Sequence, residues 1–123
     1  MATSMSGVRS APRILVVEDS RVFAALAAST IRMSYPGARV EECHTFESAA
    51  AVLSSQSFDV VVCGYGIGEG HTFHEMRELS DTPMVLLTGR LGELHVPENV
   101  QVVEKSAGPG ALLGAIGCCL TAV

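Results

Sequence analysis

Four apolar runs, continuous except for Gln101 in the last, divide this chain at intervals that predict buried β-strands. The runs cover residues 14–17, 60–63, 84–87 and 100–103 and are dominated by Val, Leu and Ile. Such runs are typical of parallel strands that helices cover on both faces. A fifth segment, residues 38–43, mixes apolar residues with two glutamates, which predicts a half-exposed strand at the edge of the sheet.

Between these runs, apolar residues recur every three or four positions, the spacing of an amphipathic helix. The expected inward positions are, in chain order, Phe23, Leu26, Ala27 and Ile31; Phe46, Ala49, Ala50 and Leu53; Phe73, Met76 and Leu79; and Leu112, Ile116, Cys119 and Val123. Thr72 and Glu75 have the spacing of a capping box and open the third of these helices. Gly89, Gly92 and Pro97 interrupt the last interval, so a helix between the fourth and fifth strands is expected to have at most about two turns.

This alternation of strands and helices predicts a three-layer α/β sandwich. Right-handed crossovers favour a doubly wound, five-stranded parallel sheet in the order 2-1-3-4-5, the flavodoxin-like arrangement, here with a shortened fourth helix. A chain of 123 residues suffices for one domain, which we expect to span residues 13–123 after a flexible tail at residues 1–12.

Chemically active side chains stand at the carboxyl ends of the expected strands, where ligands of such folds bind. Glu18 and Asp19 follow the first strand, Gly64 follows the third and Thr88 follows the fourth. Lys105, the only lysine beside seven arginines, stands just beyond the fifth strand. Acid, hydroxyl and ammonium groups together equip a phosphoryl-transfer pocket, but the glycine supplies no nucleophile.

Composition narrows the classes of partner. A net charge of −5 with scattered arginines argues against a nucleic-acid surface. No apolar stretch approaches the roughly 20 residues that span a bilayer. The cysteines at positions 43, 63, 118 and 119 show neither metal-ligand spacing nor a disulfide framework, so a reducing cytoplasm is the simplest expected location.

From about residue 12 to residue 123 the chain resembles the receiver domain of two-component response regulators. The sequence ILVVEDS at residues 14–20 is similar to that family's first strand and metal-binding acidic pair. Thr88 stands where the family has its switch hydroxyl, and Lys105 where it has the lysine that contacts the phosphoryl group. The position of the family's phosphoacceptor aspartate is occupied by Gly64.

Three further departures from the family accompany this glycine. Val102 stands where the family commonly has a switching aromatic residue, and Ser106 where it commonly has a proline. Lys105 follows Thr88 by 17 positions, several fewer than is usual, and the shortfall lies in the fourth helix. The resemblance therefore implies a divergent bacterial receiver domain that signals without phosphorylation through protein partners, and no enzymatic activity is expected.

The missing carboxylate changes what the rest of the pocket is expected to do. Glu18 and Asp19 are expected to bind Mg²⁺ weakly at most, and no other cofactor is expected. Because Lys105 has fewer competitors for Asp19 than in the family, we expect a direct Lys105–Asp19 ion pair in the pocket.

The candidate partner surface consists of three side chains near the pocket: Arg21, Tyr65 and Glu69. Receivers usually dimerise through the face built by the fourth helix, fifth strand and fifth helix. A chain with a curtailed fourth helix is not expected to form that dimer.

Other interpretations of the pocket remain open at the level of sequence. A small ligand could occupy the place of the phosphoryl group, or the chain could be an ordinary receiver inactivated by substitution at Gly64. The acidic pair could simply begin a helix, with Asp19 or Ser20 as its cap. The glycines at positions 64, 66, 68 and 70 could cradle a phosphate, although their spacing departs from G-x-G-x-x-G and the neighbouring acids repel anions.

Two motifs outside the pocket have both a functional and a plain structural interpretation. His71 and His74 could bind zinc, but a histidine pair without a third ligand is more often a solvated surface. Gly110, Gly114 and Gly117 lie along one side of the last expected helix. They could allow a partner to approach closely, or they could let the helix pack tightly on the sheet.

Overall fold

The computed structural model describes residues 11–68, 70–89 and 100–121. Within those residues it contains the elements β1 Arg13–Val17, α2 Arg21–Ser34, β2 Arg39–Cys43, α3 Phe46–Ser55, β3 Val60–Gly64, α4 Phe73–Leu79, β4 Met84–Thr88, β5 Val100–Glu104 and α5 Pro109–Thr121, with a 3-10 turn at Lys105–Ala107. The expected short helix between β4 and β5 and most of the expected N-terminal tail lie outside the described residues.

The five strands form one parallel sheet in the order β2-β1-β3-β4-β5, which confirms the predicted topology. The three central strands are buried almost throughout, whereas β2 alternates exposed and half-buried residues before ending in a buried cysteine. β2 is therefore the edge strand that its glutamates predicted.

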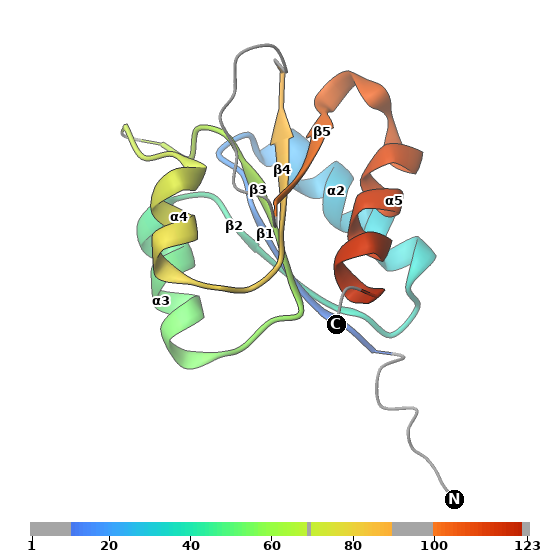
Figure 1. Cartoon of the computed structure of the whole chain (residues 1–123), viewed down its shortest axis with the longest axis horizontal. Helices are drawn as coiled ribbons and strands as arrows, with labels where there is room; N and C mark the ends of the chain where they lie inside the picture. Colours follow the sequence, from blue (N-terminus) through green and yellow to red (C-terminus); the bar gives the residue numbers. More distant parts are fainter. Residues whose placement is uncertain (1–10, 69, 90–99, 122–123) are drawn as a thin grey trace, which may run out of the picture.

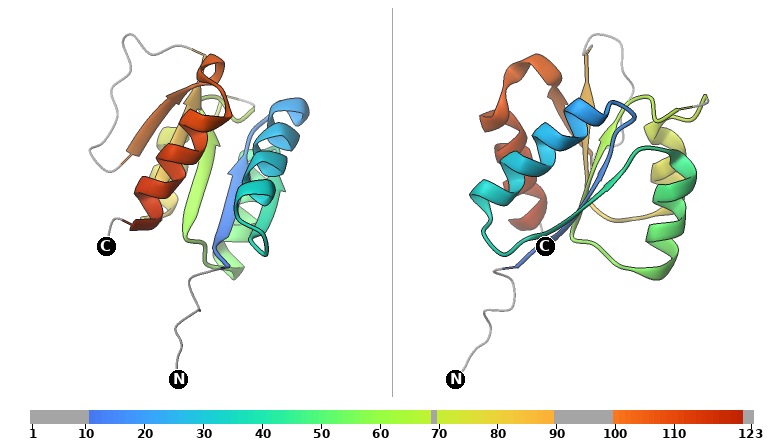
Figure 2. Two further views of the ribbon diagram at one scale, coloured as in Figure 1. Left: turned by 90° about the vertical axis from the view of Figure 1, so that its right-hand side faces the viewer. Right: turned by 180° about the vertical axis from the view of Figure 1, so that it is seen from behind.

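Two helices cover each face of the sheet, so the molecule has three layers. Figures 1 and 2 show α2 and α5 side by side on one face and α3 and α4 on the other. The α2–α5 side buries Ile14, Val16, Ile31 and Ile116 among others, and the α3–α4 side buries residues that include Phe73 and Met76. Successive residues of each strand point to opposite faces, which is why one strand contributes to both clusters.

Side-chain caps fix where three of the helices begin. The Ser20 hydroxyl accepts a hydrogen bond from the backbone N–H of Phe23 at the start of α2, and Thr45 accepts one from Ser48 at the start of α3. At α4 the Thr72 side chain and Glu75 form the predicted capping box, in which Glu75 accepts from the backbone N–H of Thr72 at 2.9 Å. These hydrogen bonds satisfy donors that the first turn of a helix otherwise leaves without partners.

Two of the expected inward positions were wrong. Leu26 on α2 is 58 % exposed and Leu79, the last residue of α4, is 49 % exposed. Helical spacing identifies the inner side of a helix only to within part of a turn, and the buried stripe of α2 is Ala24, Ala27, Ala28 and Ile31. Leu112, Ile116 and Cys119 are buried as predicted, and Val123 lies outside the described residues.

Candidate functional site

Parallel pairing brings the ends of β1, β3, β4 and β5 to one edge of the sheet. Val17 pairs with Cys63, so Glu18, one residue further along, comes beside Gly64 at the end of β3. Thr88 ends β4 and pairs with Glu104, the residue before Lys105. The structure therefore collects four of the predicted site positions at one place.

The side chain of Glu18 fills the space next to Gly64. Glu18 is only 1 % exposed, although glutamate side chains are charged at neutral pH in most proteins. A Cβ atom built on Gly64 would lie 2.5 Å from Glu18 Oε1, closer than real Cβ contacts allow, and 3.2 Å from its Cδ. The space that a residue at position 64 would need is thus taken by a carboxylate from the neighbouring strand.

Lys105 forms an ion pair with Glu18, and not with Asp19 as the sequence led us to expect. Its Nζ lies 3.1 Å from Glu18 Oε1. The other oxygen, Oε2, accepts a hydrogen bond from the backbone N–H of Ser20 at 3.1 Å. Asp19 is exposed to solvent, and a hydrogen bond between its side chain and the Glu18 carboxyl contributes to the raised pKa of Glu18. Glu18 reaches the open space and Asp19 does not, which is the physical reason for the correction.

Burial dominates the electrostatics of this carboxylate. Removal of Glu18 from water raises its pKa above the ordinary value, while the Ser20 N–H and the Lys105 ammonium favour the charged form and oppose the rise. Burial also raises the pKa of the Cys63 thiol well above its usual range, with the Glu18 charge acting in the same direction. Cys63 is therefore an inert core thiol and not a nucleophile.

The remaining predicted positions lie around this pair in different environments. Thr88 is buried at 4 % exposure, Val102 is half-buried in β5 and Ser106 is exposed in the 3-10 turn. Arg21 is exposed at the start of α2, and Tyr65 is 37 % exposed directly after Gly64. Glu69 lies outside the described residues.

Phe23 and His44 contact the Glu18–Lys105 pair, and the sequence analysis identified neither of them as a site residue. The Lys105 Nζ lies 4.4 Å from the centroid of the Phe23 ring, a cation–π contact that links the pair to α2. His44 Nδ1 lies 3.1 Å from the backbone oxygen of Glu18. Phe23 was recognised as part of a helical stripe, but nothing in its spacing indicated a contact with a residue more than 80 positions away.

These residues, as arranged, do not fit a Mg²⁺ site. Mg²⁺ needs nearly octahedral oxygen ligands at about 2.0–2.1 Å. One Glu18 oxygen lies 3.1 Å from an ammonium group, which repels a second cation, and the other accepts from a backbone N–H. Among the described residues there is no group of three or more His, Cys, Asp or Glu side chains that could hold a metal ion.

We therefore expect Mg²⁺ to bind in the millimolar range or more weakly, which corresponds to about −4 kcal/mol at most. Isothermal titration calorimetry with the wild-type chain and the Asp19→Asn variant measures this directly. Micromolar binding that disappears in Asp19→Asn would contradict the expectation, because it would show that the exposed Asp19 carboxylate holds the ion tightly.

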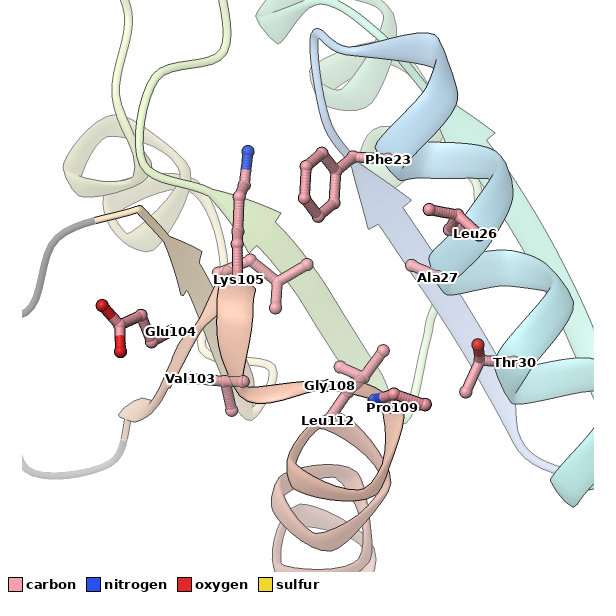
Figure 3. A pocket seen from close by; sticks show the side chains of 11 residues that line it. Phe23, Leu26, Ala27, Thr30, Val103, Glu104, Lys105, Gly108, Pro109 and Leu112 are labelled. Atoms are coloured by element: carbon pink, nitrogen blue, oxygen red, sulfur yellow. The ribbon is translucent and has the colours of Figure 1, made fainter.

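A cavity of about 160 Å³ opens beside the pair, between α2 and α5. Figure 3 shows Lys105 and Phe23 together at one end of it and Pro109 and Leu112 at the other. Leu26, exposed to solvent, lines the α2 side. The walls are mainly apolar, and Lys105 provides the only basic side chain among the lining residues.

The chain was compared with known protein families, sequences and structures, and only the structures gave matches. The chain matches no protein-family model and no curated protein sequence. Its structure resembles the N-terminal domain of a response regulator/sensory box/GGDEF 3-domain protein from Carboxydothermus hydrogenoformans, with a TM-score of 0.74, 28 % identity, and coverage of 88 % of this chain and 93 % of the other. It also resembles a CheY-like receiver domain from Methylobacillus flagellatus, with a TM-score of 0.76, 16 % identity, and coverage of 89 % and 98 %. A response regulator receiver protein from Sinorhizobium medicae gives a TM-score of 0.76 at 22 % identity, with coverage of 91 % and 96 %.

The chain has the receiver fold. In this fold the ligand edge is the one at which β1, β3, β4 and β5 end, and it is here that the structure holds the Glu18–Lys105 pair beside Gly64. No helix among the described residues of this receiver fold has the length and hydrophobicity needed to cross a membrane.

Proposed function

We propose that this chain is a degenerate receiver domain of bacterial two-component signalling, which acts without phosphorylation as a protein-interaction module. It is not an enzyme in this proposal, and it works in the cytoplasm. Its architecture supports the receiver role, and the contents of the pocket support independence from phosphorylation.

A single observation carries the proposal: Glu18 occupies the space beside Gly64 and is paired with Lys105 at 3.1 Å. Phosphoryl transfer to a receiver needs a carboxylate that can attack in line while cations neutralise the phosphoryl oxygens. Gly64 has no carboxylate, and the Glu18 carboxylate is buried with both oxygens engaged. The lysine that would receive the phosphoryl oxygens already has an internal anion as its partner.

The direct test is exposure of the protein to acetyl phosphate or beryllofluoride with Mg²⁺, followed by intact-mass and NMR measurements. We expect no covalent adduct and no change in the amide spectrum. A variant with Gly64→Asp restores a carboxylate at the end of β3 and serves as the comparison for an ordinary receiver inactivated at one position. A stable phosphoryl adduct on the wild-type chain would overturn the proposal.

The outward side of α2 is the first part of the proposed partner surface. Val22, Leu26 and Met33 are 70 %, 58 % and 81 % exposed, an unusual concentration of large apolar side chains on one surface helix. Arg21 and Arg32 flank them, and α2 contains no acidic residue, although the whole chain carries a net charge of −5. An apolar partner surface with acidic residues at its border fits this composition.

Tyr65, in the loop directly after β3, is a second and separate part of the proposed partner surface. Its ring makes an edge contact with His74 at 6.1 Å and lies 5.5 Å from the buried ring of Phe73. A tyrosine held by such contacts loses little freedom on binding, which is typical of residues that contribute strongly to interfaces.

Three glycines on α5 could allow a partner to approach the backbone of this helix closely. Cβ atoms built on Gly110 and Gly114 would meet nothing within 4 Å, and one on Gly117 would meet only the Tyr35 hydroxyl at 3.9 Å. Packing on the sheet therefore does not require these glycines, each of which weakens a helix by roughly 1 kcal/mol relative to alanine. This supports the interpretation in which they leave room for a partner.

Substitutions across the two faces are expected to separate the proposed surface from the family's usual one. Arg21→Ala, Leu26→Ala and Tyr65→Ala should each weaken partner binding about tenfold or more, because exposed anchors of this kind are worth roughly 1.4 kcal/mol or more. Changes at Glu104 in β5, and at Arg90 and Glu93, which lie outside the described residues, should have little effect.

The measurement is a pull-down of the partner from the source lysate, followed by titration of each variant against the purified partner. The result that contradicts this surface is the reverse pattern, in which the Arg90, Glu93 and Glu104 variants lose binding and the α2 and Tyr65 variants do not. Sedimentation of the chain alone checks the accompanying expectation that the usual receiver dimer does not form.

A small-molecule sensor is the second candidate function, and the cavity between α2 and α5 is the observation that favours it. The space next to Gly64 is filled by Glu18, so a ligand would occupy the neighbouring cavity of about 160 Å³ unless Glu18 moved. That volume suits a group about the size of a benzene ring. Native mass spectrometry of the purified protein distinguishes the two candidates, because only the sensor retains a low-molecular-weight ligand.

A further inference from the structure

His71 joins three separate segments on the α3–α4 side of the sheet. It stands in the loop at residues 65–72, and its ring stacks on Phe46, the first residue of α3, with centroids 4.4 Å apart and planes at 18°. Its Nδ1 lies 2.8 Å from Glu75 Oε2 on α4, and its Nε2 lies 3.4 Å from Glu47 Oε2 on α3. The four-residue spacing from His71 to Glu75 was visible in the sequence, but the contact with α3 was not.

Both ring nitrogens of His71 therefore face carboxylate oxygens. A neutral imidazole has one N–H donor and one acceptor lone pair, so one of its nitrogens would direct a lone pair at a carboxylate. Only the imidazolium ion has donors on both sides. The arrangement itself thus favours the protonated ring.

The charges around the His71 ring all raise its pKa. Within the described part of the chain, the charged groups in contact with it are Glu75 from α4 and Glu47 from α3. The hydrogen bond to Glu75 is the main cause that raises the pKa of His71, and Glu47 adds to it, while partial burial opposes the rise. The pKa of Glu75 is lowered in turn, chiefly by His71.

Glu75 couples the ring to the backbone of the loop. Its Oε1 accepts from the backbone N–H of Thr72 in the capping box, while its Oε2 contacts His71. The backbone oxygen of His71 accepts from Ile67, and its N–H donates to Gly68. Movement of the ring away from Glu75 would therefore disturb both the start of α4 and the turn that precedes it.

We propose that His71 is a proton-operated clamp, which fixes the loop segments at residues 65–68 and 70–72 to α3 and α4 when it is protonated and releases them as the pH rises. Since the folded protein holds the proton more tightly than the unfolded chain, the stabilisation is complete below the ordinary histidine value of 6.5. It is lost as the pH rises through the higher value in the folded protein. The clamp operates in the pH range in which histidine commonly acts as a switch.

The clamp is tested on the purified chain by NMR, without a partner. The ring of His71 is expected to titrate above 6.5, and its midpoint should be lower in Glu75→Gln, which keeps the capping-box acceptor but removes the charge. Glu47→Gln provides a second, exposed variant with the same expected direction. A midpoint at or below 6.5, or one unchanged in both variants, would overturn the proposal.

Hydrogen exchange tests the release of the loop. The protection factors of the Ile67 and Phe73 amides, corrected for intrinsic exchange, should fall about twofold to fivefold across the His71 midpoint, the range that partly exposed ion pairs provide. They should be independent of pH in His71→Gln. His74→Gln, which removes a neighbouring ring on α4, should behave like the wild type. Protection independent of pH in the wild-type chain would show that His71 holds no clamp.

Discussion

Replacement of Gly64 by alanine is expected to lower the free energy of unfolding by about 2 kcal/mol, the usual cost of forcing an extra group into a filled site. The new Cβ would lie 2.5 Å from Glu18 Oε1, so the carboxylate would have to leave its place between Lys105 and the Ser20 N–H. The backbone of Gly64 does not itself require glycine, because only Gly37, Gly68, Gly70 and Gly108 have positive φ angles among the described residues. The cost therefore comes from Glu18 alone.

A double-mutant cycle isolates that cause. Glu18→Asp shortens the side chain by one methylene and withdraws the carboxylate from position 64. In this background Gly64→Ala should be nearly neutral, or stabilising by up to about 1 kcal/mol because alanine restricts the unfolded chain. Gly66→Ala is the matched control, since a Cβ at Gly66 meets nothing within 4 Å. Equal costs for Gly64→Ala in both backgrounds, measured by urea unfolding, would refute the explanation.

Replacement of Lys105 by methionine is expected to lower the free energy of unfolding by about 2–3 kcal/mol at pH 7, somewhat less than the loss of a fully buried partner. Methionine retains most of the apolar stem but leaves the Glu18 charge without its ammonium at 3.1 Å. It also removes the cation–π contact with Phe23, worth about 0.5–1 kcal/mol at a partly exposed site. The Lys105 side chain is 25 % exposed, which is why the expected cost lies below that of a fully buried pair.

The cost should depend on pH in a defined direction. The pKa of Glu18 is raised by burial, so the folded protein keeps a proton on Glu18 at pH values where the unfolded chain has lost it. The free energy of unfolding therefore falls as the pH rises above the ordinary value of 4.5, and this fall should be steeper in Lys105→Met. Below 4.5 the charge-dependent part of the cost should vanish.

Glu18→Gln provides the control background, because its amide keeps an acceptor for the Ser20 N–H and carries no charge. Lys105→Met should cost at least about 1 kcal/mol less in that background than in the wild type. A cost that was the same in both backgrounds and at both ends of the pH range would show that the ion pair contributes no stability.

Much of the fold could be predicted from the sequence because strand and helix periods are local properties. The runs that became β1, β3 and β4 are apolar almost throughout, as strands covered on both faces must be, and the Thr72–Glu75 capping box marked the start of α4. Leu26 and Leu79 were misplaced because a helical stripe shows which residues share a side, but not how far the neighbouring layer extends.

For the site, the sequence by itself determined which chemical groups stand at the ends of the strands: two carboxylates after β1, none at Gly64, a hydroxyl at Thr88 and an ammonium at Lys105. Only the tertiary structure decided which carboxylate meets the lysine. The β1–β3 register puts Glu18 beside Gly64, and the missing Cβ opens a space that the Glu18 side chain enters while Asp19 remains in solvent. That choice depends on the register of a parallel pair of strands and on the volume left by one absent methyl group, neither of which is a property of any single segment.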